Sequence, residues 1–126
     1  MKQTILNAIL IGSAAWVYAA GDITLNGSFV RGAKSGAPHD LKATLTPNGA
    51  DDYKITWEAE WKGKLTLYTG QIKGDIKNGD FTGTATDKSG KRTWKVEGKA
   101  ANGVLTFDHF ETTGGREGKT GTGTLQ

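Results

Sequence analysis

The sequence predicts an all-β domain, folded as an antiparallel up-and-down meander that closes into a small eight-stranded barrel. Polar and apolar residues alternate without a break from Asp52 to Trp61, which is the pattern of a strand with one buried and one solvent-exposed face. Similar segments recur between glycine-rich turns, and helical spacing is found only in the N-terminal apolar segment. An open, strongly curved sheet is the alternative, because glycines inside strands favour bends and bulges.

Eight strands are expected, and each ends at a local turn signal. Asn48-Gly49 after Pro47 separates the second strand from the third, Lys62 to Lys64 separates the third from the fourth, and Asp87 to Gly90 the fifth from the sixth. Such short connections force sequential strands to pair as antiparallel neighbours. Closure of the meander would then remove its exposed edges. The expected strands are residues 23–31, 40–46, 52–62, 64–76, 80–87, 91–100, 104–112 and 118–125.

A repeat with an offset of 24 residues supports the hairpins of the second half. Gly74 to Thr82 and Gly98 to Thr106 both match G-x-x-x-N-G-x-[FL]-T. Each copy places an Asn-Gly pair, Asn78-Gly79 or Asn102-Gly103, between two strand-like segments. Asn-Gly is the preferred pair for a type I′ turn, which suits a two-residue hairpin loop. One repeat is therefore predicted to be one hairpin and its return connection.

The predicted core consists of large apolar residues on the inward faces of these strands. The interior of an eight-stranded barrel is just wide enough to be filled by side chains or to hold one small ligand. The expected core residues are Tyr53, Ile55, Trp57, Leu65, Leu67, Phe81, Trp94, Val96, Leu105 and Phe107.

Residues 1–19 have the pattern of a secretory signal peptide. Lys2 gives a positive start, residues 5–17 are mostly apolar, and cleavage is expected after Ala19 or Ala20. The alternative is an uncleaved anchor, but the apolar run is shorter than the roughly 20 residues that span a bilayer. Residues 20–126 then form a single domain, periplasmic or secreted, with no stable membrane span in the mature form. No cysteine is present, which excludes a lipoprotein and favours a bacterial protein.

Charge and motifs predict neither nucleic-acid binding nor catalysis. The net charge of +3 is spread among interspersed acids and bases, whereas nucleic-acid binding needs a concentrated basic face. The segment from Gly114 to Thr120 lacks the P-loop spacing and its helix. Glu58 and Glu60 share the polar face of their strand, where ion pairing is expected. No cofactor is predicted.

The two histidines give no metal or catalytic site. His39 precedes Asp40, and His109 follows Asp108. Adjacent residues of a strand point to opposite faces, so neither pair is poised to form an internal hydrogen bond. Together the four side chains could bind a metal if their segments met, but no third histidine or cysteine supports that. We expect both histidines at the surface or at an edge of the sheet.

Two family resemblances concern architecture alone. In size, export and meander topology, the predicted domain resembles calycin barrels such as lipocalins and avidins. The lipocalin-type Gly-x-Trp motif of the first strand is replaced by Gly27-Ser28-Phe29. The series Tyr68-x-Gly70, Asn78-Gly79 and Gly83 resembles a MORN-type hairpin repeat, although its spacing is longer. Neither resemblance implies a function for this chain.

The aromatic residues are the best functional candidates. The predicted function is a non-enzymatic binding module for a small apolar molecule, a glycan or an exported protein. The alternative is a structural or assembly protein of the cell envelope without a small-molecule ligand, and an enzyme ranks third because no nucleophile, base and orienting group can be assembled. A pocket is expected at the barrel end near Gly32 to Pro38 or Thr113 to Gly118, lined by Trp61 and Trp94.

The first testable prediction is export with cleavage. Intact-mass measurement of the protein from the periplasm or medium should find a chain that begins at Ala20 or Gly21, because the apolar segment is too short to remain as an anchor. An uncleaved chain recovered in the membrane pellet would contradict this prediction.

Overall fold

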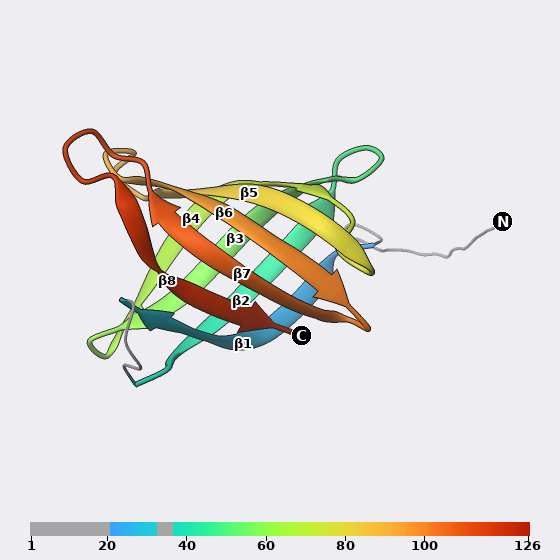
Figure 1. The fold of residues 1–126 in the computed structure, drawn as a ribbon, viewed down its shortest axis with the longest axis horizontal. Helices are drawn as coiled ribbons and strands as arrows, with labels where there is room; N and C mark the ends of the chain where they lie inside the picture. Colours follow the sequence, from blue (N-terminus) through green and yellow to red (C-terminus); the bar gives the residue numbers. More distant parts are fainter. Residues whose placement is uncertain (1–20, 33–36) are drawn as a thin grey trace, which may run out of the picture.

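The structure, a computed structural model, describes residues 21–32 and 37–126, which form one closed antiparallel barrel (Figure 1). Each strand pairs with the next, and β8 pairs with β1. The predicted meander barrel is confirmed, and the open sheet is excluded. The strands are β1 (Ile23–Arg31), β2 (His39–Pro47), β3 (Asp52–Trp61), β4 (Lys64–Gly74), β5 (Gly79–Asp87), β6 (Thr93–Ala101), β7 (Val104–Glu111) and β8 (Gly118–Leu125).

The predicted signal peptide, residues 1–19, lies outside the described residues. Within the described ranges, no helix is long and apolar enough to cross a membrane.

One of the two predicted type I′ turns is present. Asn102 and Gly103 have φ values of 52° and 81°, as this turn requires at both central positions. Lys62 and Gly63, at 52° and 76°, join β3 to β4 in the same way. In both hairpins the residue before the turn pairs with the residue after it.

The prediction for Asn78-Gly79 is wrong, because β4 already ends at Gly74 and a four-residue loop follows. The Asp75 Oδ1 atom accepts hydrogen bonds from the backbone N–H groups of Lys77 and Asn78, at 2.8 and 3.0 Å. Such a side-chain turn replaces the backbone turn. Ile76, in the same loop, is buried. The loop therefore helps to close this end of the barrel.

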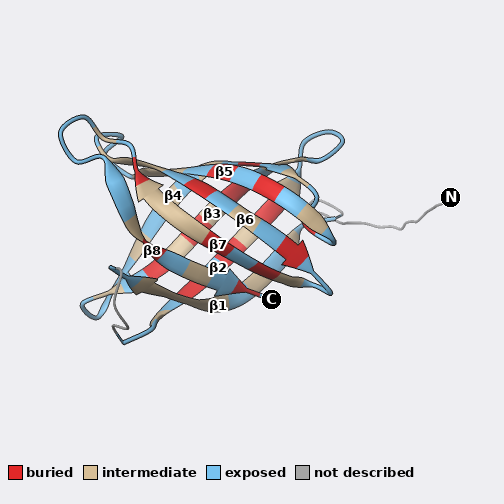
Figure 2. Ribbon diagram, in the orientation of Figure 1, coloured by how far each residue is buried: buried red, intermediate tan, exposed pale blue. Residues whose placement is uncertain are grey.

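Inward side chains fill the barrel most completely at the end where β1 begins. Buried and exposed residues alternate along the strands (Figure 2). Leu45, Ile72 and Leu125 are the largest fully buried side chains. Among the expected core residues, Ile55, Trp57, Phe81, Val96, Leu105 and Phe107 are buried, and Tyr53 and Trp94 are partly buried.

The predicted face of β4 is wrong at its start. Leu65 and Leu67 are 65% and 43% exposed. The tight turn at Lys62-Gly63 pairs Leu65 with Glu60 and Leu67 with Glu58. Directly paired residues lie on the same face of a sheet, so both leucines share the outer face with the glutamates.

The inward face of β4 has a glycine at Gly70, where the neighbouring strand approaches closely. The carbonyl of Thr84 on β5 lies where a Cβ on Gly70 would stand. The indole Nε1 of Trp57, on β3, donates a hydrogen bond of 3.1 Å to this carbonyl. The backbone N–H of Gln71 donates instead to the Thr84 hydroxyl, at 3.0 Å. The absent side chain of Gly70 therefore lets a buried indole find an acceptor two strands away.

The second testable prediction compares two aliphatic truncations on β4. Ile72→Ala should lower the free energy of unfolding by about 2–5 kcal/mol, because Ile72 is 1% exposed. Leu67→Ala, on the outer face of the same strand, should cost less than about 1 kcal/mol. Urea denaturation of the two variants measures both values. A cost for Leu67→Ala equal to that of Ile72→Ala would contradict the observed face.

Candidate functional site

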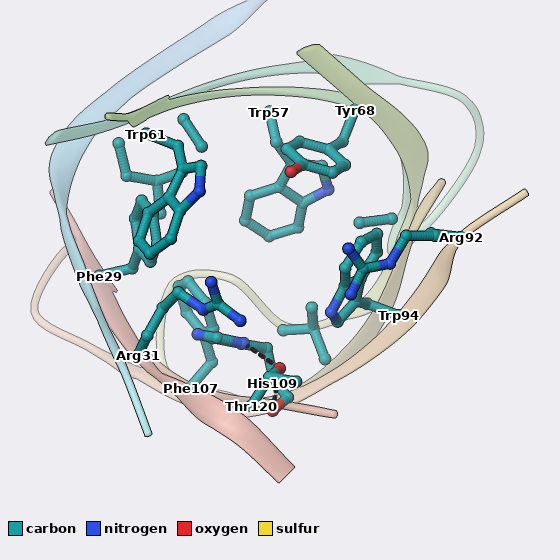
Figure 3. Close-up of a pocket in the computed structure, with 14 residues that line it drawn as sticks. Phe29, Arg31, Trp57, Trp61, Tyr68, Arg92, Trp94, Phe107, His109 and Thr120 are labelled. Atoms are coloured by element: carbon teal, nitrogen blue, oxygen red, sulfur yellow. Dashed lines mark hydrogen bonds between the residues drawn. The ribbon is translucent and has the colours of Figure 1, made fainter. Parts of the chain in front are cut away.

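A cavity of about 180 Å³ opens at the barrel end where β1 finishes and β2 begins. The turn at residues 62–63 and the loops at residues 88–92 and 112–117 border the same end (Figure 1). Side chains from all eight strands and from the loop before β6 surround the cavity (Figure 3). The lining residues are Phe29, Arg31, Leu41, Trp57, Ala59, Trp61, Tyr68, Ala85, Arg92, Trp94, Val96, Phe107, His109 and Thr120.

The aromatic walls are held by contacts between rings. Trp57 and Phe107 lie with their centroids 5.6 Å apart, and Tyr68 meets Trp94 edge to face at 5.3 Å. Such tilted and edge-to-face pairs are the favoured aromatic geometries. Burial raises the pKa of the Tyr68 hydroxyl, so the phenol is neutral near pH 7. The rings therefore present a rigid, apolar surface to the cavity.

Both tryptophans expected at a pocket belong to this lining. Trp61 is the last residue of β3 and contacts the ring of His39, with centroids 4.8 Å apart. Trp94, near the start of β6, faces the cavity from the opposite side (Figure 3). Both are partly buried. Their position is now known, and their role in binding a ligand stays a prediction.

Two arginines flank the mouth, each beside a tryptophan. The Arg31 Cζ atom lies 4.4 Å from the ring centroid of Trp61, and the Arg92 Cζ atom lies 5.1 Å from that of Trp94. Arg92 also forms a bidentate ion pair with Glu111, with Nε–Oε2 at 2.8 Å and Nη2–Oε1 at 2.7 Å. The pair lowers the pKa of Glu111 and holds it ionised. The charge of Arg92 is thereby neutralised within the protein.

The prediction that both histidines lie at the surface or at an edge is wrong for His109. Its Nδ1 atom lies 2.6 Å from the Thr120 hydroxyl, which lies 3.0 Å from the His109 carbonyl. Both contacts are satisfied when Nδ1–H donates to the hydroxyl and the hydroxyl donates to the carbonyl. The Nε2 atom is buried without a hydrogen bond, although the Val30 carbonyl is near the ring.

The ring of His109 is neutral at pH 7. Burial lowers its pKa to about 4, with a further decrease from the positive charge of Arg31 and a small one from Lys119. Asp108 opposes the change, but its side chain forms an ion pair with Lys119 at 3.3 Å. Among the described residues, no carboxylate forms a hydrogen bond with the ring, and the hydroxyl proton of Thr120 is donated to the His109 carbonyl. The pair is therefore suited to shaping the wall and not to activating a nucleophile.

No metal-binding group of three or more histidine, cysteine or carboxylate side chains occurs in the part of the chain that the structure describes. His39 and His109 do approach the same ring, that of Phe29, with centroids 5.1 and 6.2 Å away. Glu58 and Glu60 lie on the outer face of β3, opposite Leu67 and Leu65. The described residues that line the cavity have aromatic, aliphatic and cationic side chains, and none of them is a carboxylate.

Sequence reasoning missed the polar members of the lining, although a signal for some of them exists. Arg31 continues the inward series of Leu25 and Phe29 at every second position of β1. His109 continues the series of Leu105 and Phe107 on β7 in the same way. A charged or titratable residue at the last inward position of a strand marks the barrel mouth.

The third testable prediction concerns acid stability. The unfolded chain binds a proton at His109 near the ordinary pKa of 6.5, and the folded chain only near 4. Stability from the neutral ring is therefore complete above about pH 6.5 and is lost as the pH falls toward about 4. The loss is at most about 3 kcal/mol, and solvent screening of the partly exposed ring reduces it.

Urea denaturation of the wild type and of His109→Gln at the two ends of this pH range measures the effect. The variant should lose less stability on acidification, because the replacement does not titrate. The carboxylates with lowered pKa, such as Glu111, contribute equally to both proteins. Equal losses in the two proteins would contradict the prediction.

Comparisons with protein-family models, with curated proteins and with solved structures find no match for this chain. Any function must therefore be inferred from the chemistry of the cavity itself. That chemistry consists of aromatic stacking surfaces, an apolar floor and the N–H donors of an arginine at the mouth.

Proposed function

We propose that the protein is an exported, non-enzymatic binding module whose barrel mouth holds one small, flat and largely apolar molecule. The main support is the cavity itself. In a barrel with three tryptophans on β3 and β6, the side chains fill one end and leave about 180 Å³ free at the other. Concave, mostly apolar spaces with a few convergent polar groups are the usual form of small-molecule sites.

The volume limits the size of the ligand. A closed apolar cavity of about 150 Å³ is enough for a benzene molecule, whereas pockets for larger ligands are roughly 300–1,000 Å³. A volume near 180 Å³ therefore suits a single ring with a short substituent. Trp57, whose indole N–H is already bonded to Thr84, offers only its apolar surface to such a molecule.

A small ligand is favoured over a glycan by the orientation of the tryptophans. Trp57 and Trp61 lie inside the barrel together with Ile55 and Ala59 and do not form a platform on its outer surface. An extended polysaccharide would need aromatic rings exposed along the sheet. The remaining alternative, an assembly protein of the cell envelope, is supported by the two exposed leucines, Leu65 and Leu67.

The fourth testable prediction is that a larger side chain in the cavity weakens ligand binding. Ala85 lines the cavity and pairs with Trp94 across β5 and β6. Ala85→Leu should weaken binding of 2-phenylethanol by about tenfold or more, because the added carbons occupy the space of the ligand. Titrations followed by the NMR signals of the indole N–H groups measure the affinity and report which tryptophans respond.

Ala101→Leu is the matched control, because Ala101 is exposed at the opposite end of β6 and its replacement should leave the affinity unchanged. A panel with a short-chain lipid and an oligosaccharide tests the other ligand classes in the same assay. Self-association without a response to any probe would contradict the proposal and favour the assembly protein.

A further inference from the structure

The two arginines at the cavity mouth differ in whether their charge is neutralised. Arg92 is bound by both carboxylate oxygens of Glu111, whose side chain is 4% exposed. Arg31 takes part in none of the ion pairs formed among residues 21–32 and 37–126. None of the described residues that line the cavity is acidic. Lys62, in the turn after β3, places its Nζ atom 5.9 Å from the centroid of the Trp61 ring and also forms no ion pair with the described residues. The mouth therefore has an excess of positive charge, and Arg31 is the unpaired cation within the described lining.

The guanidinium of Arg31 is placed so that its donors remain free. Its Cζ atom lies 4.4 Å from the centroid of the Trp61 ring, and stacking on an aromatic face leaves the in-plane N–H groups available. In Figure 3 the side chain extends from β1 into the mouth, above His109. Its charge acts on groups inside the barrel, since it adds to the effect of burial in lowering the pKa of His109 and opposes the burial that raises the pKa of Tyr68.

We propose that the ligand is a single-ring aromatic carboxylate, with its ring among the tryptophans and its carboxylate on Arg31. This inference rests on the proposed binding function and specifies the class of ligand. A planar guanidinium matches a carboxylate with two parallel hydrogen bonds. The ring enters the space beside Trp57 and Trp94, and the carboxylate stays at the mouth, where it remains partly hydrated.

A cationic or a neutral ligand would interact less favourably with Arg31 than an anionic ligand would. A cationic ligand would be repelled by Arg31, because no free carboxylate lines the cavity to receive it. A neutral ligand would gain the aromatic contacts and leave the guanidinium hydrated as before. His109 does not change this balance at pH 7, because burial keeps its pKa near 4 and its ring uncharged.

The fifth testable prediction uses three probes that share a ring and differ in charge: phenylacetate, phenylacetamide and 2-phenylethylamine. The wild-type protein should bind phenylacetate most tightly and 2-phenylethylamine most weakly at pH 7. Arg31→Gln should weaken phenylacetate binding by about tenfold or more, as expected for loss of a hydrogen bond to a charged group. The same variant should change phenylacetamide binding by less than about twofold.

Two further variants keep the test specific. Arg31→Lys preserves the charge but not the planar pair of donors, and it should give an intermediate affinity for phenylacetate. Arg116→Gln removes a positive charge from the β7–β8 loop at the same end, where Arg116 is exposed and outside the lining, and it should leave the ratio of phenylacetate to phenylacetamide affinity unchanged. Thermal unfolding of each variant shows that the barrel is intact.

Equal affinities of wild type and Arg31→Gln for phenylacetate would overturn this inference, and binding of phenylacetamide would then leave the general binding function standing. Failure of all three probes to bind would overturn both the ligand class and the proposed function. An equal loss in Arg116→Gln and Arg31→Gln would also overturn the inference, because the effect would then come from the overall charge of this end.

Discussion

Closure of the sheet by pairing β8 with β1 is the constraint on which the interior of this protein depends. Eight strands enclose a space only as wide as a layer of side chains. The residues at the inward positions along each strand therefore determine whether side chains fill this space or leave a cavity. At the end where β1 begins, Leu45, Ile72 and Leu125 leave no room. At the other end, large rings stand around a free space that they do not fill.

Trp57 lies between the filled end of the barrel interior and the end that contains the cavity. It is 5% exposed and belongs to the buried cluster, yet one side of its indole lines the cavity. Its Nε1–H donates to Thr84 on β5 through the gap left by Gly70. Burial of an indole without a partner for its N–H would be costly. The glycine on β4 thus allows a tryptophan on β3 to form the floor of the cavity.

Of the two arginines that line the mouth, Arg92 is paired within the protein and Arg31, among the described residues, is not. Arg92 and Glu111 form their ion pair because β6 and β7 are neighbours. Asn78 and Asn102 of the sequence repeat meet at the opposite end, where the Asn102 N–H donates to Asn78 Oδ1 at 3.2 Å. The repeat therefore contributes to the end of the barrel opposite the cavity. Arg31 forms no ion pair with the described residues.

The sequence by itself determined the local features of the protein. Strict alternation specified both faces of β3, and Asn102-Gly103 specified its turn, because side-chain direction in a strand and positive φ in a two-residue turn follow from short-range sterics. The series of alternate residues in β1 and β7 also contained the inward positions of Arg31 and His109, although the sequence does not show that these positions meet.

Only the tertiary structure decided which face of β4 is buried and whether the aromatic residues form a core or a cavity. In Leu65-Thr66-Leu67-Tyr68 the apolar residues fall on both faces, so the alternation is ambiguous. The register across Lys62-Gly63 resolves it by placing the leucines opposite glutamates. The meeting of Phe29 on β1 with His109 on β7, with ring centroids 6.2 Å apart, likewise depends on closure, which brings strands from distant parts of the chain together. Such contacts have no local signal, because they depend on the register of every strand between them.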